Sequence, residues 1–390
     1  MELINISPLA GMSYCKVGPR GEAWQVAVVR AAFSLVPGEP LQWVDEPAEL
    51  VMADVYHGEE PTTSALRHET DLVWTKPVCD VIVAGHAHAP LGRAASRWQA
   101  AVQIGKQRHA MTIAGPRHWR KRLTGWSLDA PELAHSVPLD YGLAFGGDPT
   151  LGQPVKPGAQ SKALPDNPVG VGYYQKRYMD SARTYAAPQF EVTGTPYTDF
   201  GSKYPVLGFS PLSRWWPSRY RHAGTMDEQW KANGYPYLPA NFDTRFYNGA
   251  PQSLQIPHPK GGEEIALLGL WPTGNTSPGS NAHGAVHTSL PLGFPEAQIH
   301  TISTVHASMP MSLDTIVIDT DARRVYLSWR VVVAQSEHPQ LCAVRWPEWQ
   351  QAHMGNAPEN RSENRPNESE AMDATATAHA AHAQREVAHG

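Results

Sequence analysis

The sequence predicts a mainly β protein built from antiparallel sheets, of a sandwich or barrel-like kind, with a long loop-rich middle region and few short helices. Three observations support this prediction. Segments near both ends are apolar runs or alternate apolar with polar residues, as strands do. The middle carries proline or glycine every few residues, and these residues interrupt long regular elements. One short stretch in the middle favours a helix.

The strands of the first half follow from the local pattern. Residues 23–36 and 79–84 are apolar runs bounded by glycine or proline, and both have the length of a buried strand. Residues 97–104 and 109–113 alternate, and Gly105-Lys106-Gln107 turns the chain between them. This arrangement predicts a hairpin with one buried face.

A second hairpin is expected near the other end. Residues 313–318 and 324–333 are rich in Val, Ile, Tyr and Trp, and Asp319-Thr320-Asp321 lies between them. β-branched and aromatic residues favour strands, whereas aspartate favours turns because its carboxylate accepts hydrogen bonds from nearby backbone. Both ends of the chain therefore favour sheet.

We expect four regions along the chain. Residues 1–147 form a β-rich region, 148–288 a loop-rich aromatic region, and 289–345 a set of β hairpins. Residues 357–390 form a polar tail that is expected to be disordered, because it cannot bury enough apolar area to offset its ordering entropy. The two β-rich regions can share one sheet, in which case the middle is an insertion and not a domain; both alternatives stay open.

The middle region is punctuated by Pro and Gly, with Tyr, Trp and Phe between them. We expect ordered, irregular loops that are pinned by their aromatic side chains. One short helix is predicted near residues 225–232, where Thr225 has the side chain to cap it. Long loops with this aromatic content indicate function more than disorder.

Charge and composition narrow the classes of partner. The net charge is −5, so no global attraction to nucleic acid or to an anionic membrane is expected. No apolar stretch approaches the ~18 residues of a membrane span, and no leader pattern opens the chain. Three distant cysteines do not make a disulfide framework or a zinc ribbon. We therefore expect a cytoplasmic protein.

The familiar catalytic fingerprints are missing: no phosphate-binding loop, no nucleophile elbow, no zinc-binding His-Glu-x-x-His and no Cys-x-x-Cys. We therefore predict no catalytic residue, no cofactor and no enzyme activity. His86 and His88 have a spacing that places both imidazoles on one face of a strand, which makes them weak metal candidates. Packing or hydrogen bonding at a strand end explains the pair as well.

Aromatic residues are the most informative excess, with 13 Trp and 14 Tyr. Rings supply large contact area at low entropic cost, which suits a protein-binding surface. Their alternative role is to fasten irregular loops to the core. A dense basic run, residues 117–122, surrounds one Trp and can grip an acidic partner or lie solvated in a loop. The partner-binding candidates are Arg117, Trp119, Trp215, Trp216 and Trp230.

A series of short motifs resembles a family of bacterial type VI secretion accessory proteins, a domain of unknown function encoded beside VgrG spike and PAAR tip genes. The resemblance covers roughly residues 1–340, and it rests on the order in which the motifs follow one another. They are Asp71-x4-Lys76-Pro77-x2-Asp80-x4-Gly85-x-Ala87-x-Ala89-Pro90, Gly115-x-Arg117-x-Trp119, Pro138-Leu139-x-Tyr141-x3-Phe145-Gly146-Gly147, Asn167-Pro168-x-Gly170, Gly208-Phe209-x-Pro211, Gly224-Thr225-x-Asp227-x2-Trp230 and Phe242-Asp243-x-Arg245-Phe246-x-Asn248-x-Ala250-Pro251.

The resemblance implies an adaptor or chaperone that binds a toxic effector and helps to load it on the VgrG/PAAR spike. It implies no catalytic residues. The chain departs from the pattern at Pro116, where an acidic residue is expected. The alternative is a hydrolase of carbohydrate or peptidoglycan, which needs an aromatic cleft and two carboxylates about 5 to 10 Å apart. A metal-dependent enzyme built on His86 and His88 is a third possibility.

Overall fold

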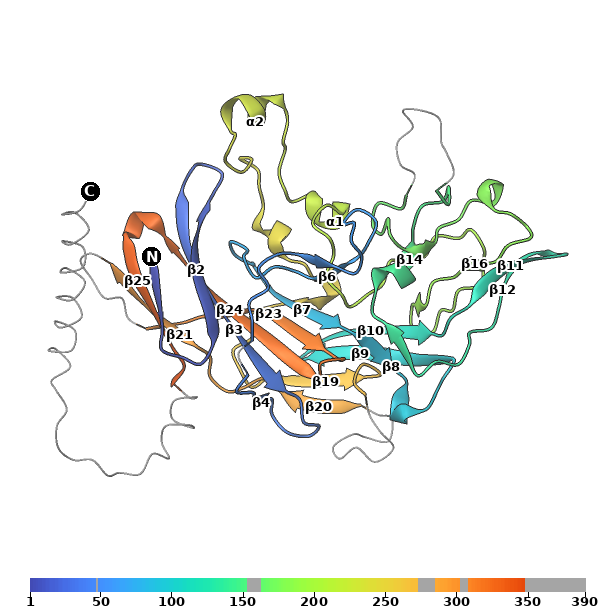
Figure 1. The fold of residues 1–390 in the computed structure, drawn as a ribbon, viewed down its shortest axis with the longest axis horizontal. Helices are drawn as coiled ribbons and strands as arrows, with labels where there is room; N and C mark the ends of the chain where they lie inside the picture. Colours follow the sequence, from blue (N-terminus) through green and yellow to red (C-terminus); the bar gives the residue numbers. More distant parts are fainter. Residues whose placement is uncertain (47, 153–162, 273–284, 302–307, 348–390) are drawn as a thin grey trace, which may run out of the picture. The chain divides into compact units, whose positions relative to one another are not determined.

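The computed structural model describes residues 1–46, 48–152, 163–272, 285–301 and 308–347 (Figure 1). All of them belong to one unit, Met1–Glu348. The predicted tail, residues 357–390, lies outside the described residues. The prediction of a mainly β protein with a loop-rich middle and few short helices is confirmed, and each described sheet is open.

The largest sheet joins strands from both ends of the chain. β23 pairs in parallel with β7, and β24 pairs in antiparallel fashion with β3, so segments about 240 and 300 residues apart become neighbours. The predicted strands and the second hairpin are confirmed here. In spatial order the sheet contains β18 (Gln255–Ile256), β7 (Cys79–Ala84), β23 (Ser312–Asp319), β24 (Arg324–Ala334), β3 (Ala23–Ser34) and β2 (Ala10–Val17), with β4 (Gln42–Trp43) on β3.

A five-stranded sheet contains the first predicted hairpin. Ile104 pairs with Gln107, so Gly105 and Lys106 form the turn. The loop-rich middle contributes three more strands to this sheet. One of them, β19, forms in an apolar run that is free of proline from Glu264 until Pro272. In spatial order the sheet contains β17 (Phe190–Glu191), β10 (Gln107–Ala114), β9 (Arg97–Ile104), β19 (Glu264–Leu268) and β20 (Val286–Ser289).

The remaining strands form smaller sheets. A four-stranded sheet contains β1 (Glu2–Asn5), β25 (Pro339–Arg345), β21 (Glu296–Thr301) and β22 (Met309–Pro310). A three-stranded sheet contains β12 (Gly125–Leu128), β11 (His118–Arg122) and β16 (Tyr185–Ala186). The pairs are β13 (Ser136–Pro138) with β8 (His86–His88), β14 (Phe145–Gly146) with β15 (Val171–Gly172), and β5 (Val55–Tyr56) with β6 (Leu66–His68).

Helices are short throughout the described residues. The two α-helices are α1 (Pro217–Tyr220) and α2 (Glu228–Asn233), and none is long and apolar enough to cross a membrane. The 3₁₀ turns are η1 (Pro90–Gly92), η2 (Tyr141–Leu143), η3 (Lys176–Tyr178), η4 (Thr244–Tyr247), η5 (Gln252–Leu254) and η6 (Gln335–Glu337).

The predicted helix near residues 225–232 exists as α2, but the prediction that Thr225 caps it is wrong. The cap is Asp227, whose Oδ1 accepts a hydrogen bond from Trp230 N at 2.9 Å. Thr225 instead bonds with Asn241 on the returning limb of the loop: its N–H donates to Asn241 Oδ1, and its hydroxyl accepts from Asn241 Nδ2. The hydroxyl is therefore used for a contact distant in sequence, which local pattern does not reveal.

Candidate functional site

The most distinctive surface feature is an excursion of the chain over residues 214–247, here called the aromatic arm. Leu212 N donates to Gly249 O at 2.8 Å, so the two ends of the excursion meet. The aromatic arm contains α1, α2 and η4. Figure 1 shows α2 at the far end of the arm, away from the sheets.

Hydrogen bonds between its two limbs give the aromatic arm a defined shape. Asp243 N donates to His222 O at 3.0 Å near the base. Farther out, Thr225 N donates to Asn241 Oδ1 at 2.9 Å, and beyond it Trp230 Nε1 donates to Tyr237 O at 2.9 Å. These bonds replace the regular ladder that proline and glycine prevent, so the irregular backbone is still paired.

Arg219 fastens the base of the aromatic arm. This side chain is 2% exposed, and its guanidinium donates to Glu69, to Leu212 O at 2.7 Å and to Phe246 O at 3.1 Å. The bonds therefore join the incoming limb, the outgoing limb and the body of the protein. A planar guanidinium with five donors suits this task, since a lysine cannot reach three acceptors in one plane.

Glu69 links Arg219 to a larger buried network of ion pairs. Lys76 Nζ lies 3.4 Å from Glu69 and 2.8 Å from Asp80 Oδ2. Asp80 in turn accepts from Gly249 N at 2.8 Å, at the end of the aromatic arm. Four cations and four anions of the network are at most 9% exposed: Arg30, Lys76, Arg219, Arg330, Glu69, Asp71, Asp80 and Asp314.

Several residues of the network lie on strands of the largest sheet, and the network joins this sheet to two other segments of the chain. Arg330 of β24 binds Asp314 of β23 at 2.6 Å, and Arg30 of β3 binds Asp71 at 2.9 Å. The hydroxyl of Thr315 connects Lys76 to the Arg330–Asp314 pair, because it accepts from Lys76 at 3.0 Å and donates to Asp314 at 2.9 Å. The sheet, the segment after β6 and the base of the aromatic arm are therefore held by one set of charges.

The charges in this network shift one another's pKa values. Burial alone raises the pKa of Glu69, but Arg219, Lys76 and Arg214 outweigh it and lower the pKa to about 2. Burial lowers the pKa of Lys76, while Asp80 and Glu69 reverse that effect and hold it above its ordinary value. Removing one partner from such a pair leaves a buried charge uncompensated, which typically costs ~3–5 kcal/mol. The network thus positions the arm with little tolerance for change.

The aromatic arm exposes apolar side chains from its base to its outer end. Tyr235 is 71% exposed and Tyr220 53% exposed. The other exposed members are Trp215, Met226 and Tyr237. Tyr237 also lies against the β2–β3 turn, since a β-carbon on Gly21 would come within 3.2 Å of its ring. Rings and methionine held on an anchored support are typical of interface hot spots.

The structure separates the five partner-binding candidates. Trp215, Trp216 and Trp230 lie on the aromatic arm, where Trp215 is exposed, Trp230 is half-buried and Trp216 is completely buried. Arg117 and Trp119 lie elsewhere, at the start of β11, and are 2% and 3% exposed. As folded, three of the five candidates are packed inside, and only Trp215 and part of Trp230 are accessible.

Arg117 and Trp119 have internal partners. Arg117 pairs with Glu191 at 2.8 Å and donates to Pro188 O at 2.7 Å. The ring of Trp119 packs edge-on against Phe200, 5.3 Å between centroids. Trp119 therefore fastens the three-stranded sheet to a neighbouring loop, which is the alternative role that the sequence left open for the aromatic residues. Arg117 is buried and is not part of a solvated loop, which was the alternative for the basic run.

His86 and His88 lie on β8 with their ring centroids 6.4 Å apart. His86 Nδ1 is 2.9 Å from both carboxylate oxygens of Asp321, so this imidazole is already paired. Burial lowers the pKa of His88. Within the described part of the chain, no three His, Cys, Asp or Glu side chains are placed to hold one metal ion.

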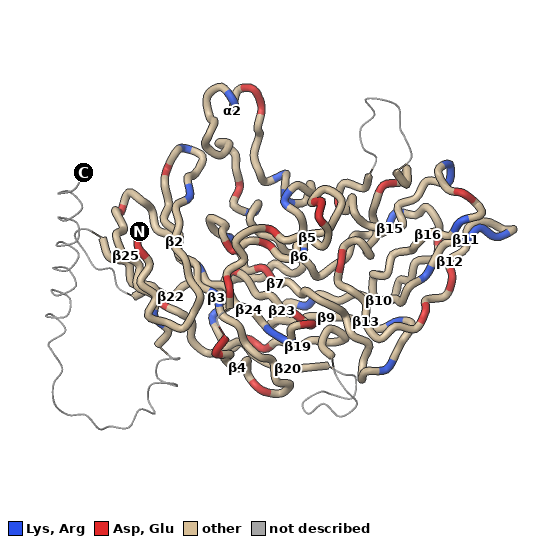
Figure 2. Tube along the Cα trace, in the orientation of Figure 1, with Lys and Arg blue, Asp and Glu red and all other residues tan. Residues whose placement is uncertain are grey.

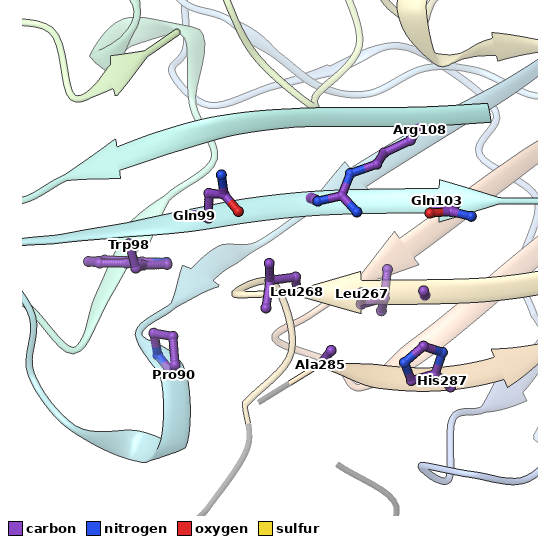
Figure 3. Close-up of a pocket in the computed structure, with 11 residues that line it drawn as sticks. Pro90, Trp98, Gln99, Gln103, Arg108, Leu267, Leu268, Ala285 and His287 are labelled. Atoms are coloured by element: carbon purple, nitrogen blue, oxygen red, sulfur yellow. The ribbon is translucent and has the colours of Figure 1, made fainter. Parts of the chain in front are cut away.

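A hollow of about 580 Å³ lies on the five-stranded sheet. Figure 3 shows the residues that line it. Gln99 and Gln103 of β9, Arg108 of β10 and His287 of β20 line it together with apolar residues. The hydrolase alternative needs two carboxylates in a groove. None of the described residues that line this hollow is Asp or Glu, so the hollow lends that alternative no support.

Sequence reasoning missed the buried network, although a signal was present. Asp80, Asp314 and Arg330 each interrupt an apolar run that forms a strand. A charge inside such a run is rarely buried without a partner. Their partners lie far away in sequence, for example 150 residues between Glu69 and Arg219, and cannot be read from one chain. Several motif residues that carry the family resemblance lie in this network, namely Asp71, Lys76, Asp80 and Asn248.

A family model described as an uncharacterized protein conserved in bacteria, DUF2169, matches residues 20–330. The chain belongs to this family. The matched range contains the buried network and the aromatic arm. Comparison with curated proteins and with solved structures finds no significant match.

Proposed function

We propose that this member of the DUF2169 family is a non-enzymatic adaptor, or chaperone, that binds a type VI secretion effector and helps to load it on the VgrG/PAAR spike. The observation that carries the proposal is the aromatic arm: five exposed apolar side chains lie on one excursion whose base is locked by buried ion pairs. This arrangement suits the binding of another polypeptide.

Binding costs free energy for every side chain and loop that becomes ordered, at about 0.5–1.5 kcal/mol for each flexible side chain. The aromatic arm is already ordered by Arg219 and by its cross-limb bonds, and rings have few rotatable bonds. Much of the ordering cost is therefore met during folding, which leaves more of the contact energy for a partner.

The type VI assignment rests on the order of motifs in the sequence and is compatible with membership of a bacterial family. The buried position of several motif residues gives that resemblance a physical meaning. Lys76, Asp80 and Asn248 hold the base of the aromatic arm. A chain that contains these three residues therefore has the contacts that hold the arm in place.

Affinity capture tests the proposal. The full chain is used as bait in its own bacterium, beside the double variant Trp215→Ala/Tyr235→Ala and the control Leu133→Ala, a 71% exposed leucine outside the arm. We expect wild type and control to recover an effector and a spike component, and the double variant to lose most of both. Equal recovery by all three baits, or recovery of neither component by folded wild type, would contradict the proposal.

A further inference from the structure

A cavity of about 160 Å³ opens at the base of the aromatic arm. It has room for a side chain of several heavy atoms. Its described lining is cationic and polar: it includes Arg219, Arg221, Arg245 and His222, and it contains no Asp or Glu. Cationic lining without an internal carboxylate is the composition expected of an anion-binding site.

The positive charge of this cavity is not fully neutralised by neighbouring residues. Arg219 is paired with Glu69, and Arg245 Nε donates to Asp243 Oδ2 at 2.8 Å. Arg221 has no carboxylate partner among the residues that the structure describes, and its Nε donates to His222 Nε2 at 3.2 Å. The remaining donors of Arg221 are therefore free to bind an anion in a bidentate manner.

A second observation at the cavity concerns Asn248, which is 1% exposed. Its Nδ2 donates to Val78 O at 2.9 Å and to Asp80 Oδ1 at 3.0 Å, and this fixes the orientation of the amide. Oδ1 of the same amide is buried and accepts no hydrogen bond in the described part of the chain. This oxygen has almost no accessible surface, so Asn248 holds the wall of the cavity in place while the arginines face the ligand.

We propose that this cavity binds the carboxylate of an aspartate or glutamate side chain in an acidic segment of the partner polypeptide, with the guanidinium of Arg221 donating to the carboxylate. The inference rests on the proposed adaptor function, since the carboxylate belongs to the bound polypeptide. Inorganic phosphate matches the cations by charge as well, so it serves as the competing probe.

His222 supplies a readout that is independent of affinity. Burial lowers the pKa of His222, Arg245 and Arg221 lower it further, and Asp243 opposes them at 3.8 Å. A carboxylate bound beside the imidazole adds negative charge and stabilises the protonated ring. Occupancy of the cavity therefore raises the pKa of His222, which NMR titration of the histidine resonances measures.

The experiment uses the full chain and two capped tripeptides, acetyl-Ala-Glu-Ala-amide and its Gln counterpart. We expect the Glu peptide to bind saturably in the millimolar range and to raise the pKa of His222, whereas the Gln peptide does neither. Arg221→Gln should weaken binding about tenfold or more. The matched control is Arg183→Gln, an exposed arginine paired with Asp180 on another segment, and it should bind as wild type does.

Three results would overturn the inference: no saturable binding of the Glu peptide, equal binding of both peptides, or undiminished binding by Arg221→Gln. Stronger binding of inorganic phosphate than of the Glu peptide would also overturn it, in favour of a phosphate site. Failure of the cavity is distinguishable from failure of the adaptor function, because capture through Trp215 and Tyr235 is measured separately.

Discussion

The aromatic arm and the β11–β12 hairpin have similar residue types in opposite arrangements. In the arm, Arg219 is buried at the base while Tyr235 is exposed at the outer end. In the hairpin the aromatic rings face inward: Trp126 stacks on Phe200 at 5.3 Å. Arg120 and Arg122 lie on the opposite face, and Arg120 is 48% exposed in its pair with Asp129. Figure 2 shows the Lys and Arg positions of β11 in blue.

The difference follows from the backbone. A hairpin alternates its side chains between two faces, so Trp119 and Trp126 share the packed face while Arg120 and Arg122 share the other. The arm has no ladder to impose alternation, and each side chain is placed by individual hydrogen bonds. Residue type alone therefore does not decide which surface can bind a partner; the position of the backbone does.

The largest expected effect separates the two kinds of arginine. Arg219→Met leaves Glu69 short of its closest cation in a buried site, and we expect a loss of about 3–5 kcal/mol in the free energy of unfolding. Arg120→Met removes an exposed pair and should cost less than about 1 kcal/mol. Urea denaturation measures both variants, and similar losses would contradict the contrast.

The pH dependence of stability gives the next effect. Since the pKa of Glu69 falls from 4.5 to about 2 on folding, its contribution is complete above about pH 4.5 and disappears as the pH drops toward 2. The shift corresponds to about 3 kcal/mol, at ~1.4 kcal/mol for each pKa unit. The stability gap between wild type and Glu69→Gln should narrow over that range. A constant gap would show that the carboxylate is not held by its cations.

Gly249→Ala tests how tightly the end of the aromatic arm fits the network. A β-carbon there collides with Glu69 Oε2 and lies 3.4 Å from Arg219 Nη1. We expect a loss of about 1–3 kcal/mol from overpacking. Because Glu69→Ala removes the colliding group, the same glycine substitution should cost little in that background, as a double-mutant cycle measures. Equal costs in both backgrounds would place the collision elsewhere.

The smallest effect on stability belongs to the outer rings. Tyr235 is 71% exposed, so Tyr235→Ala should change the free energy of unfolding by no more than about 0.5 kcal/mol. Trp119→Ala, by contrast, empties a buried site and should cost about 3–5 kcal/mol. Thermal or chemical denaturation checks the pair. A large loss from Tyr235→Ala would mean that the outer ring serves the fold rather than a partner.

Local pattern was sufficient for the elements whose partners are close in sequence. The β9–β10 and β23–β24 hairpins follow from alternation and turn residues within about 20 positions. The parallel pairing of β7 with β23 joins residues 235 apart, as between Thr315 and Asp80, and no local pattern encodes it.

The candidate site was predicted only in part. An aromatic, irregular middle was expected, yet Trp215 and its neighbour Trp216 are chemically alike and only the first is exposed. That choice depends on the packing of Trp216 against Tyr141, which lies more than 70 residues earlier in the sequence; the centroids of the two rings are 5.3 Å apart. Likewise, Arg117 stands in a basic run of the sequence, and nothing in that run reveals that its guanidinium pairs with Glu191 inside the protein.

Hydrogen exchange of the captured complex tests the central claim most directly, namely that this protein holds another polypeptide through the aromatic arm. Amides of residues 214–247 should gain protection when the effector is bound, since contact with the rings excludes water and suppresses opening of the limbs. Protection confined to the hollow on the five-stranded sheet, with the arm exchanging as in the free protein, would contradict the account.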